Sequence, residues 1–383
     1  MNLAAVLGSV SVPGLAAVWF AEIASAQGSH QHGSPSTGTG LSTEELTAGI
    51  AHGTSLGAIV FLAGLVAFVT LVWLPSDRVE DADQEKAVNL LCRWMWVLVG
   101  LLVAAGLVEL SLYAVRASGE AFSLRLFQEA LFDTRVGQIW VVRIALGISV
   151  ATAATYAAQK LVGAGYRWGV AVFLSGLLLA TLTLQSHAAA EGGFLPVAAD
   201  WLHVAAASLW MGGLLGFPIL LIGPLRAMPF ETRAKLLGRV VPRFSKVATM
   251  AVMSLILTGL VAILLHVPSL SALQSTPYGR ALSVKLCLLI FLLALGARNL
   301  RLRGREPFGS LVKYELALAI IIFVATGFLT SLPPADAARP GIEKNEPNSV
   351  ENLRQPPMPP APNAAAQSVE DSGGPAASAS RSP

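Results

Sequence analysis

Eight apolar stretches, each long enough to cross a lipid bilayer, constrain this chain more than any other feature of its sequence. About 20 apolar residues span the hydrocarbon core as a helix. The stretches are continuous and do not alternate with polar residues, so they favour helices over the strands of a membrane barrel. The predicted fold is all-α, a polytopic membrane bundle of about eight transmembrane helices, near residues 49–74, 91–113, 137–159, 168–187, 199–225, 247–267, 281–299 and 312–332.

The composition fits a protein with little aqueous surface. Apolar residues make up 54% of the 383 and charged residues 13%, whereas a soluble domain carries about 25% charged residues. This excludes a soluble enzyme. The sequence has no nucleotide-binding loop, Ser-His-Asp order or HExxH motif, so no enzymatic activity is expected. A net charge of +3 gives no reason to expect nucleic acid as a partner, and membrane lipid is the expected environment.

The two ends of the chain differ from its apolar middle. Residues 1–26 end in Ala24-Ser25-Ala26, a pattern typical of a cleaved signal peptide, but they lack a basic start, so an uncleaved anchor is the alternative. Residues 27–48 are expected to form a short periplasmic segment before a transmembrane domain over 49–332. Residues 333–383 hold 11 of the 22 prolines and predict a disordered tail.

The basic residues predict which way the helices run through the membrane. The loops and flanks of one side hold sixteen Lys and Arg residues, and those of the other side hold four, Arg116, Arg125, Arg135 and Arg280. Because cytoplasmic loops carry the excess of basic residues, the ends of the eight-helix domain are expected to face outward. In a bacterium this places them in the periplasm and the protein in the inner membrane.

All the histidines fall near the outer side of this predicted topology. They are His30, His32, His52, His187, His203 and His266. His52 and His203 lie about one helical turn inside the outer ends of the first and fifth predicted helices, and His187 closes the fourth. Imidazole is a ligand for copper, zinc, iron and nickel, so this grouping predicts a metal site. A helix–helix hydrogen bond is the alternative role for a membrane histidine.

Four charged residues are predicted at the same level, Glu109, Arg143, Asp200 and Lys285. A charge inside a membrane helix is costly, and such residues mark functional sites or pair with one another. The simpler alternative is that Glu109 and Asp200 neutralise Arg143 and Lys285. Both interpretations place polar groups within an apolar bundle.

His203 follows Asp200 by three residues and precedes Trp210 by seven. These spacings put all three residues on one face of the fifth predicted helix. A carboxylate one turn from an imidazole can accept its second N–H, which orients a metal-bound histidine. Met211 lies deeper on the same helix, and a thioether favours monovalent copper, although Met is also a common core residue. Gly212, Gly213 and Gly216 predict a close approach to a neighbouring helix.

The order of short motifs in the second half resembles the copper resistance protein D family. These motifs are Ser186-His187-Ala188, Asp200-Trp201-Leu202-His203, Leu209-Trp210-Met211-Gly212-Gly213, Arg243-Phe244-Ser245, Leu257-Thr258-Gly259, Thr276-Pro277-Tyr278-Gly279-Arg280 with Lys285, Glu315, and Leu329-Thr330-Ser331-Leu332-Pro333-Pro334. The resemblance is specific over residues 185–335 and extends to 49–184 only in overall layout.

The resemblance implies an inner-membrane protein of copper uptake or copper tolerance, working beside a periplasmic copper-binding protein. His187 and His203 are the expected copper ligands and His52 the third, with Asp200 orienting His203. Glu109 would add a charge at the mouth, and Trp210 and Met211 would line the pathway.

Two other functions fit the same residues. Histidines on four helices could hold a b-type haem near the outer side, although two haems across the bilayer would need inner histidines. A copper sensor or assembly factor that does not transport copper is the second alternative. Sequence leaves the direction of transport and the oxidation state of copper open.

Overall fold

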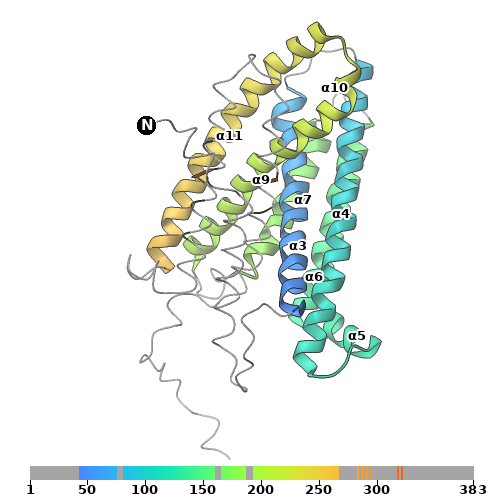
Figure 1. The fold of residues 1–383 in the computed structure, drawn as a ribbon, viewed down its shortest axis with the longest axis vertical. Helices are drawn as coiled ribbons and strands as arrows, with labels where there is room; N and C mark the ends of the chain where they lie inside the picture. Colours follow the sequence, from blue (N-terminus) through green and yellow to red (C-terminus); the bar gives the residue numbers. More distant parts are fainter. Residues whose placement is uncertain are drawn as a thin grey trace, which may run out of the picture. The chain divides into compact units, whose positions relative to one another are not determined.

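The computed structural model describes residues 43–75, 81–159, 165–186 and 193–266, together with isolated positions between 283 and 321. Every regular element in these ranges is a helix. The elements are α3 (Thr43–Ala67), the π-helical turn η1 (Phe68–Trp73), α4 (Asp81–Ser118), α5 (Leu124–Phe132), α6 (Arg135–Ala158), α7 (Gly165–Thr183), α9 (Phe194–Ile222), α10 (Pro224–Ala227) and α11 (Phe230–His266), shown in Figure 1.

Six helices of the described ranges are long and apolar enough to cross a membrane, and they coincide with the first six predicted spans. Their ends extend beyond the apolar runs: α4 begins at Asp81 rather than residue 91, and α11 begins at Phe230 rather than 247. The first helix begins at Thr43, so its first turn belongs to the segment expected to precede the membrane. A helix can continue beyond the bilayer through polar residues because its hydrogen bonds are made by the backbone and not by the side chains.

Several predictions lie outside the described residues. These are the N-terminal segment 1–26, most of 27–48, the tail 333–383, and nearly all of the last two predicted helices. The isolated positions described within those two helices are helical. Leu318 is buried in the main hydrophobic core, and Phe291 and Ile321 pack against it.

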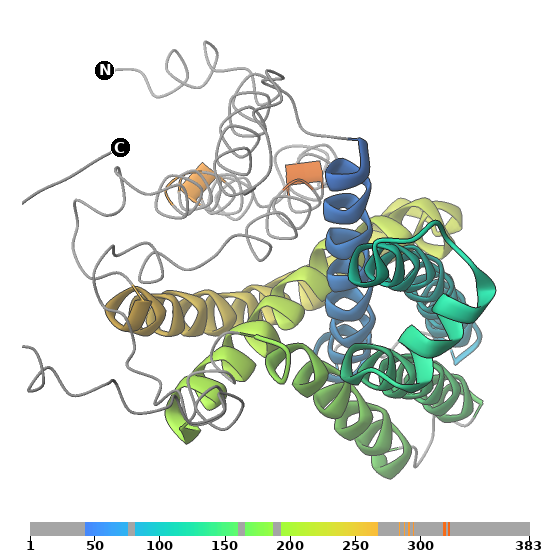
Figure 2. The same ribbon diagram turned by 90° about the horizontal axis from the view of Figure 1, so that it is seen from below.

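Helix α3 occupies the centre of the described bundle. It contacts α4, α6, α7 and α9 (Figure 2), and its span is 78% buried, against 11% for the span on α11. A helix that is apolar on all sides is suited to such a position. Ile59, Leu62 and Leu65 are fully buried along it.

Glycines allow α3 and α9 to cross closely, as the sequence predicted for Gly212, Gly213 and Gly216. A Cβ atom on Gly64 or Gly212 would meet the backbone of the other helix. Gly213 leaves room for the ring of Phe244, and Gly216 for the ring of Phe68. Phe217 stacks edge-on against both rings, with centroids 5.2 Å from Phe68 and 5.3 Å from Phe244. Small residues and close packing are what hold helices together where lipid removes the hydrophobic driving force.

Successive long helices alternate in direction, so one end of the bundle collects the starts of α3, α6 and α9 and the ends of α4, α7 and α11. Cross-helix hydrogen bonds from His52, Arg143 and His203 join these elements near that end. We call it the histidine end, defined by His52 and His203. The short helix α5 connects α4 to α6 there and packs Ala130 against Leu110 and Ala114.

Candidate functional site

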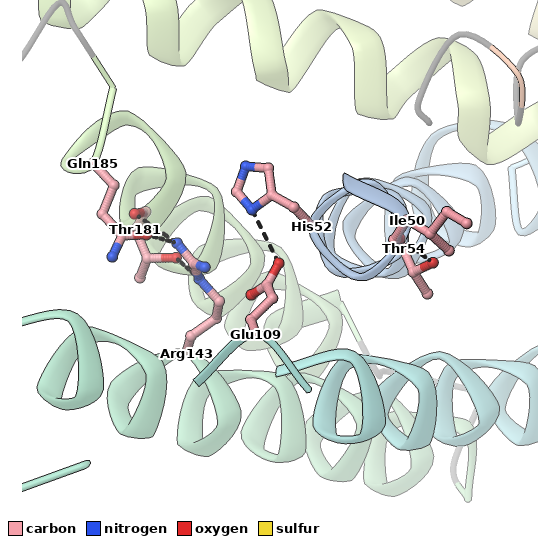
Figure 3. A network of polar contacts seen from close by, with 7 residues as sticks. All are labelled: Ile50, His52, Thr54, Glu109, Arg143, Thr181 and Gln185. Carbon is pink, nitrogen blue, oxygen red and sulfur yellow. Dashed lines mark hydrogen bonds and ion pairs between the residues drawn. The ribbon is translucent and has the colours of Figure 1, made fainter. Parts of the chain in front are cut away.

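His52 and Glu109 form a polar pair at the histidine end. Nδ1 of His52 on α3 lies 3.0 Å from Oε1 of Glu109 on α4, and Figure 3 shows the two side chains facing each other. Their side chains are 36% and 20% exposed. An ionised Glu109 can only accept, and such a pair requires the proton of the ring on Nδ1. The structure therefore brings together two of the predicted site residues.

Arg143 lies beside this pair on α6 and is almost fully buried, with 4% exposed. Its Nε donates to Oγ1 of Thr181 at 3.2 Å, and one terminal nitrogen donates to the Thr181 carbonyl at 3.1 Å and to Oε1 of Gln185 at 2.7 Å. The charge of Glu109 also acts on the guanidinium. Figure 3 shows the two sets of contacts near each other, one between His52 and Glu109 and the other between Arg143, Thr181 and Gln185. Neutral oxygens thus supply the hydrogen bonds to Arg143 that the structure describes.

His203 is the second candidate ligand that the structure describes. Its Nδ1 lies 2.9 Å from Oγ1 of Thr258 on α11, across the α9–α11 interface. His203 is partly buried, and Thr258 is buried with 7% exposed. Thr258 Oγ1 also lies 2.7 Å from the carbonyl of Ser254 one turn earlier. His203 is therefore held by a residue of another helix.

Asp200, expected to orient His203, is partly buried on the same helix. Among the hydrogen bonds of the described residues, the one at His203 Nδ1 goes to Thr258 and not to Asp200. The neighbouring Trp201 donates its indole N–H to the carbonyl of Gly176 on α7 at 3.1 Å, which ties the start of α9 to that helix. Sequence reasoning missed Thr258, although it lies within the quoted Leu257-Thr258-Gly259 motif.

Trp210 and Met211 are both buried in the core along α9, with 6% and 5% exposed. Burial suits a pathway residue and a packing residue equally, so their pathway role stays a prediction. Met250 and Met253 on α11, by contrast, are 71% and 53% exposed. These two thioethers are therefore not part of the buried core that includes Met211.

His187, His30, His32 and Lys285 lie outside the described residues, so the expected pairing of His187 with His203 is not described. Within the described ranges, no group of three or more His, Cys, Asp or Glu side chains is close enough to hold a metal ion. The described part of the bundle thus supplies two separate imidazoles near one end, each with an oxygen partner at Nδ1. Imidazole nitrogens of this kind suit copper in either oxidation state.

Two family patterns match the chain. The pattern described as "Copper resistance protein D-like, N-terminal domain" matches residues 45–197, which include α3 to α7. The pattern described as "Copper resistance protein D" matches residues 238–329, which include most of α11. His52 and Glu109 lie within the first match and Thr258 within the second, whereas His203 lies between the two.

Two named relatives support the same family. The chain is 32% identical over 269 residues to the "Copper transport protein CutJ" of Bacillus subtilis (strain 168), covering 67% of this chain and 49% of that protein. It is 30% identical over 211 residues to the "Copper resistance protein D" of Pseudomonas syringae pv. tomato, covering 53% of this chain and 65% of that protein. The chain thus spans about half the length of the first relative and just under two thirds of the second.

No solved structure shows a significant match to the chain. The family patterns cover both halves of the transmembrane region, and both relatives carry copper in their names. With the helical bundle described above, these matches establish that the chain is a multi-pass membrane protein of the copper resistance protein D family.

Proposed function

We propose that this protein carries copper ions across the bacterial inner membrane, and thereby contributes to copper homeostasis or resistance. The names of both relatives support copper as the cargo and favour it over haem. The single observation that carries the proposal is the placing of His52 and His203 at one end of the central helix pair α3 and α9, within a bundle that is otherwise largely apolar.

The histidine end is the proposed entry for the ion. His203 and His52 are the proposed ligands, and His187 is the third, since it comes shortly after the end of α7 in the sequence. Copper is cargo here, so the ligands must release it as well as bind it. A site of few imidazoles, with the remaining positions taken by the ion's previous or next partner, suits such an exchange.

The charge distribution supports entry from the periplasm. In the predicted topology sixteen basic residues of the loops and flanks lie on the side opposite the histidines and four on theirs, which by the positive-inside rule supports an outward-facing histidine end. A periplasmic copper-binding protein is the proposed donor. The exposed apolar side chains of Phe122, Leu124 and Phe132 around α5 suit the lipid interface at this end.

Copper uptake into proteoliposomes tests the proposal. Purified protein is reconstituted, copper is added outside, and trapped copper is measured by mass spectrometry after quenching with a chelator. We expect uptake by the parent protein and its loss in the double variant His52→Ala, His203→Ala at equal reconstituted amounts. His266→Ala, which lies outside the quoted motifs, is the control and should retain most uptake. Equal uptake by vesicles with parent and double variant would contradict the proposal.

A further inference from the structure

The Thr258 hydroxyl lies within hydrogen-bond distance of His203 and of two backbone carbonyls of its own helix, those of Ser254 and Leu255. A hydroxyl has one hydrogen to donate, and Thr258 Oγ1 lies 2.7 Å from the Ser254 carbonyl, which can only accept. A hydroxyl hydrogen donated to Ser254 leaves Oγ1 as an acceptor, and the contact of 2.9 Å with His203 then takes the N–H of the ring at Nδ1. In a neutral imidazole the lone pair then resides on Nε2.

We propose that Thr258 is a positioning residue that selects the metal-binding tautomer of His203, an inference that rests on the proposed function of His203 as a copper ligand. Metal-bound histidines commonly donate their second ring N–H to an oxygen, which fixes the ring and strengthens the ligating nitrogen. Thr258 provides that oxygen from α11, so the orientation of a ligand on α9 depends on how the two helices pack.

The surroundings of Thr258 support a specific contact. Its neighbours Leu257 and Leu260 on α11 are 60% and 53% exposed, whereas Thr258 is 7% exposed. The face of α11 that carries Thr258 is thus turned toward the bundle, and α11 packs against α9. The hydroxyl is placed where a valine would fill the same volume at the interface without offering an acceptor.

The other described histidine at this end has an equivalent arrangement. His52 on α3 contacts Glu109, which lies near the end of the antiparallel helix α4, at 3.0 Å through the same ring nitrogen. Both candidate ligands thus contact an oxygen of a neighbouring antiparallel helix through Nδ1.

Substitutions at Thr258 and at a matched threonine test this role. Thr258→Val removes the acceptor and keeps the shape, and Thr258→Ser restores the acceptor. Thr249→Val is the control, because Thr249 lies on the same helix and makes the same bond to the carbonyl four residues earlier, at 2.7 Å from Ser245, but is exposed and meets no histidine in the described ranges. His203→Ala is measured in parallel, at equal reconstituted amounts.

In the uptake assay, Thr258→Val should raise the copper concentration for half-maximal uptake about 10–100-fold, as loss of an orienting partner does at metal sites. Thr258→Ser and Thr249→Val should behave like the parent. Nitrogen NMR of ring-labelled histidine, which needs no copper, should show that Thr258→Val shifts His203 away from a single tautomer with the proton on Nδ1.

The outcomes separate the two ideas. If His203→Ala abolishes uptake but Thr258→Val matches the parent in both uptake and tautomer, the positioning role of Thr258 is wrong and the ligand role of His203 stands. Equal loss of uptake in Thr258→Val and Thr258→Ser, with the tautomer unchanged, would show a purely structural role and overturn the inference. If His203→Ala transports copper like the parent, the proposed function of His203 fails and the inference fails with it.

Discussion

Oε1 of Glu109 lies 3.0 Å from Nδ1 of His52, although 57 residues separate them along the chain. Sequence reasoning treated the first as a charge at the mouth and the second as a ligand, without connecting them. Their contact joins the central helix α3 to α4 at the histidine end. It also leaves Arg143 to be held directly by the neutral oxygens of Thr181 and Gln185.

The first prediction concerns the charge of Glu109. Glu109→Gln keeps an oxygen acceptor for His52 but removes the negative charge, and the effect of such outer-shell partners on metal affinity is about 10–100-fold. We expect the copper concentration for half-maximal uptake to rise within that range, with transport restored at high copper. Glu129→Gln is the matched control, since Glu129 is exposed on α5 and pairs with Arg125 at 2.8 Å. Identical copper dependence in Glu109→Gln and the parent would show that Glu109 does not support His52.

The second prediction concerns the geometry of the Arg143 guanidinium. The guanidinium makes three hydrogen bonds to Thr181 and Gln185. The compact ammonium group of a lysine cannot reproduce that planar arrangement. Arg143→Lys should lower the free energy of unfolding by about 0.6–1.7 kcal/mol, the range for polar contacts inside membrane bundles. The measurement is the unfolding equilibrium in detergent. Arg125→Lys, whose parent side chain is 87% exposed, should be unchanged; equal stability of Arg143→Lys and the parent would contradict the assignment.

The third prediction concerns the crossing of α3 and α9. A Cβ atom at Gly212 would meet the backbone of Gly64, which has no flexible side chain to move aside. Gly212→Ala should therefore destabilise the bundle by about 1–3 kcal/mol, as overpacking of a core does. Gly100→Ala is the control on α4, because a Cβ there meets nothing within 4 Å. Gly100→Ala should be neutral or slightly stabilising. The measurement is the midpoint of thermal unfolding of each variant in detergent, and equal midpoints for the two variants would contradict the close crossing.

The fourth prediction concerns orientation in the membrane. A single cysteine introduced at Gly119, between α4 and α5, should react in intact spheroplasts with a thiol reagent that cannot cross the membrane. One introduced at Met228, between α10 and α11, should react only after the membrane is opened. Both positions are tested in a background that lacks Cys92 and Cys287. The reverse pattern would place the histidine end in the cytoplasm and overturn the proposed direction of entry.

The sequence was sufficient to predict the helices but not most of their side-chain partners. The apolar runs give the first six spans because length and hydropathy are properties of a continuous segment, and Gly212 marked a close helix crossing for the same local reason. The orienting role of Asp200, one turn from His203, stays a prediction. Helical periodicity places Asp200 and His203 on one face of α9, but it does not define which residue of a facing helix lies against that face, and the oxygen described at His203 Nδ1 belongs to Thr258 on α11.

Arg143 illustrates the same limit. Its position in an apolar run predicted a buried charge in need of compensation, and the structure confirms the burial. The choice of Thr181 and Gln185 as direct partners depends on the rotation of α7 against α6, which periodicity does not define. Thr181 and Gln185 are ordinary polar residues in the sequence, so no signal singled them out.

X-ray absorption spectroscopy of the purified, copper-loaded protein tests the central claim most directly. The account predicts that copper is bound with the outer-shell scattering of imidazole rings, and that this scattering falls in both His52→Ala and His203→Ala. An absorption spectrum of the same sample should show no haem Soret band. Copper bound without imidazole scattering, or with scattering unchanged in both variants, would contradict the assignment of the histidine end as the copper site.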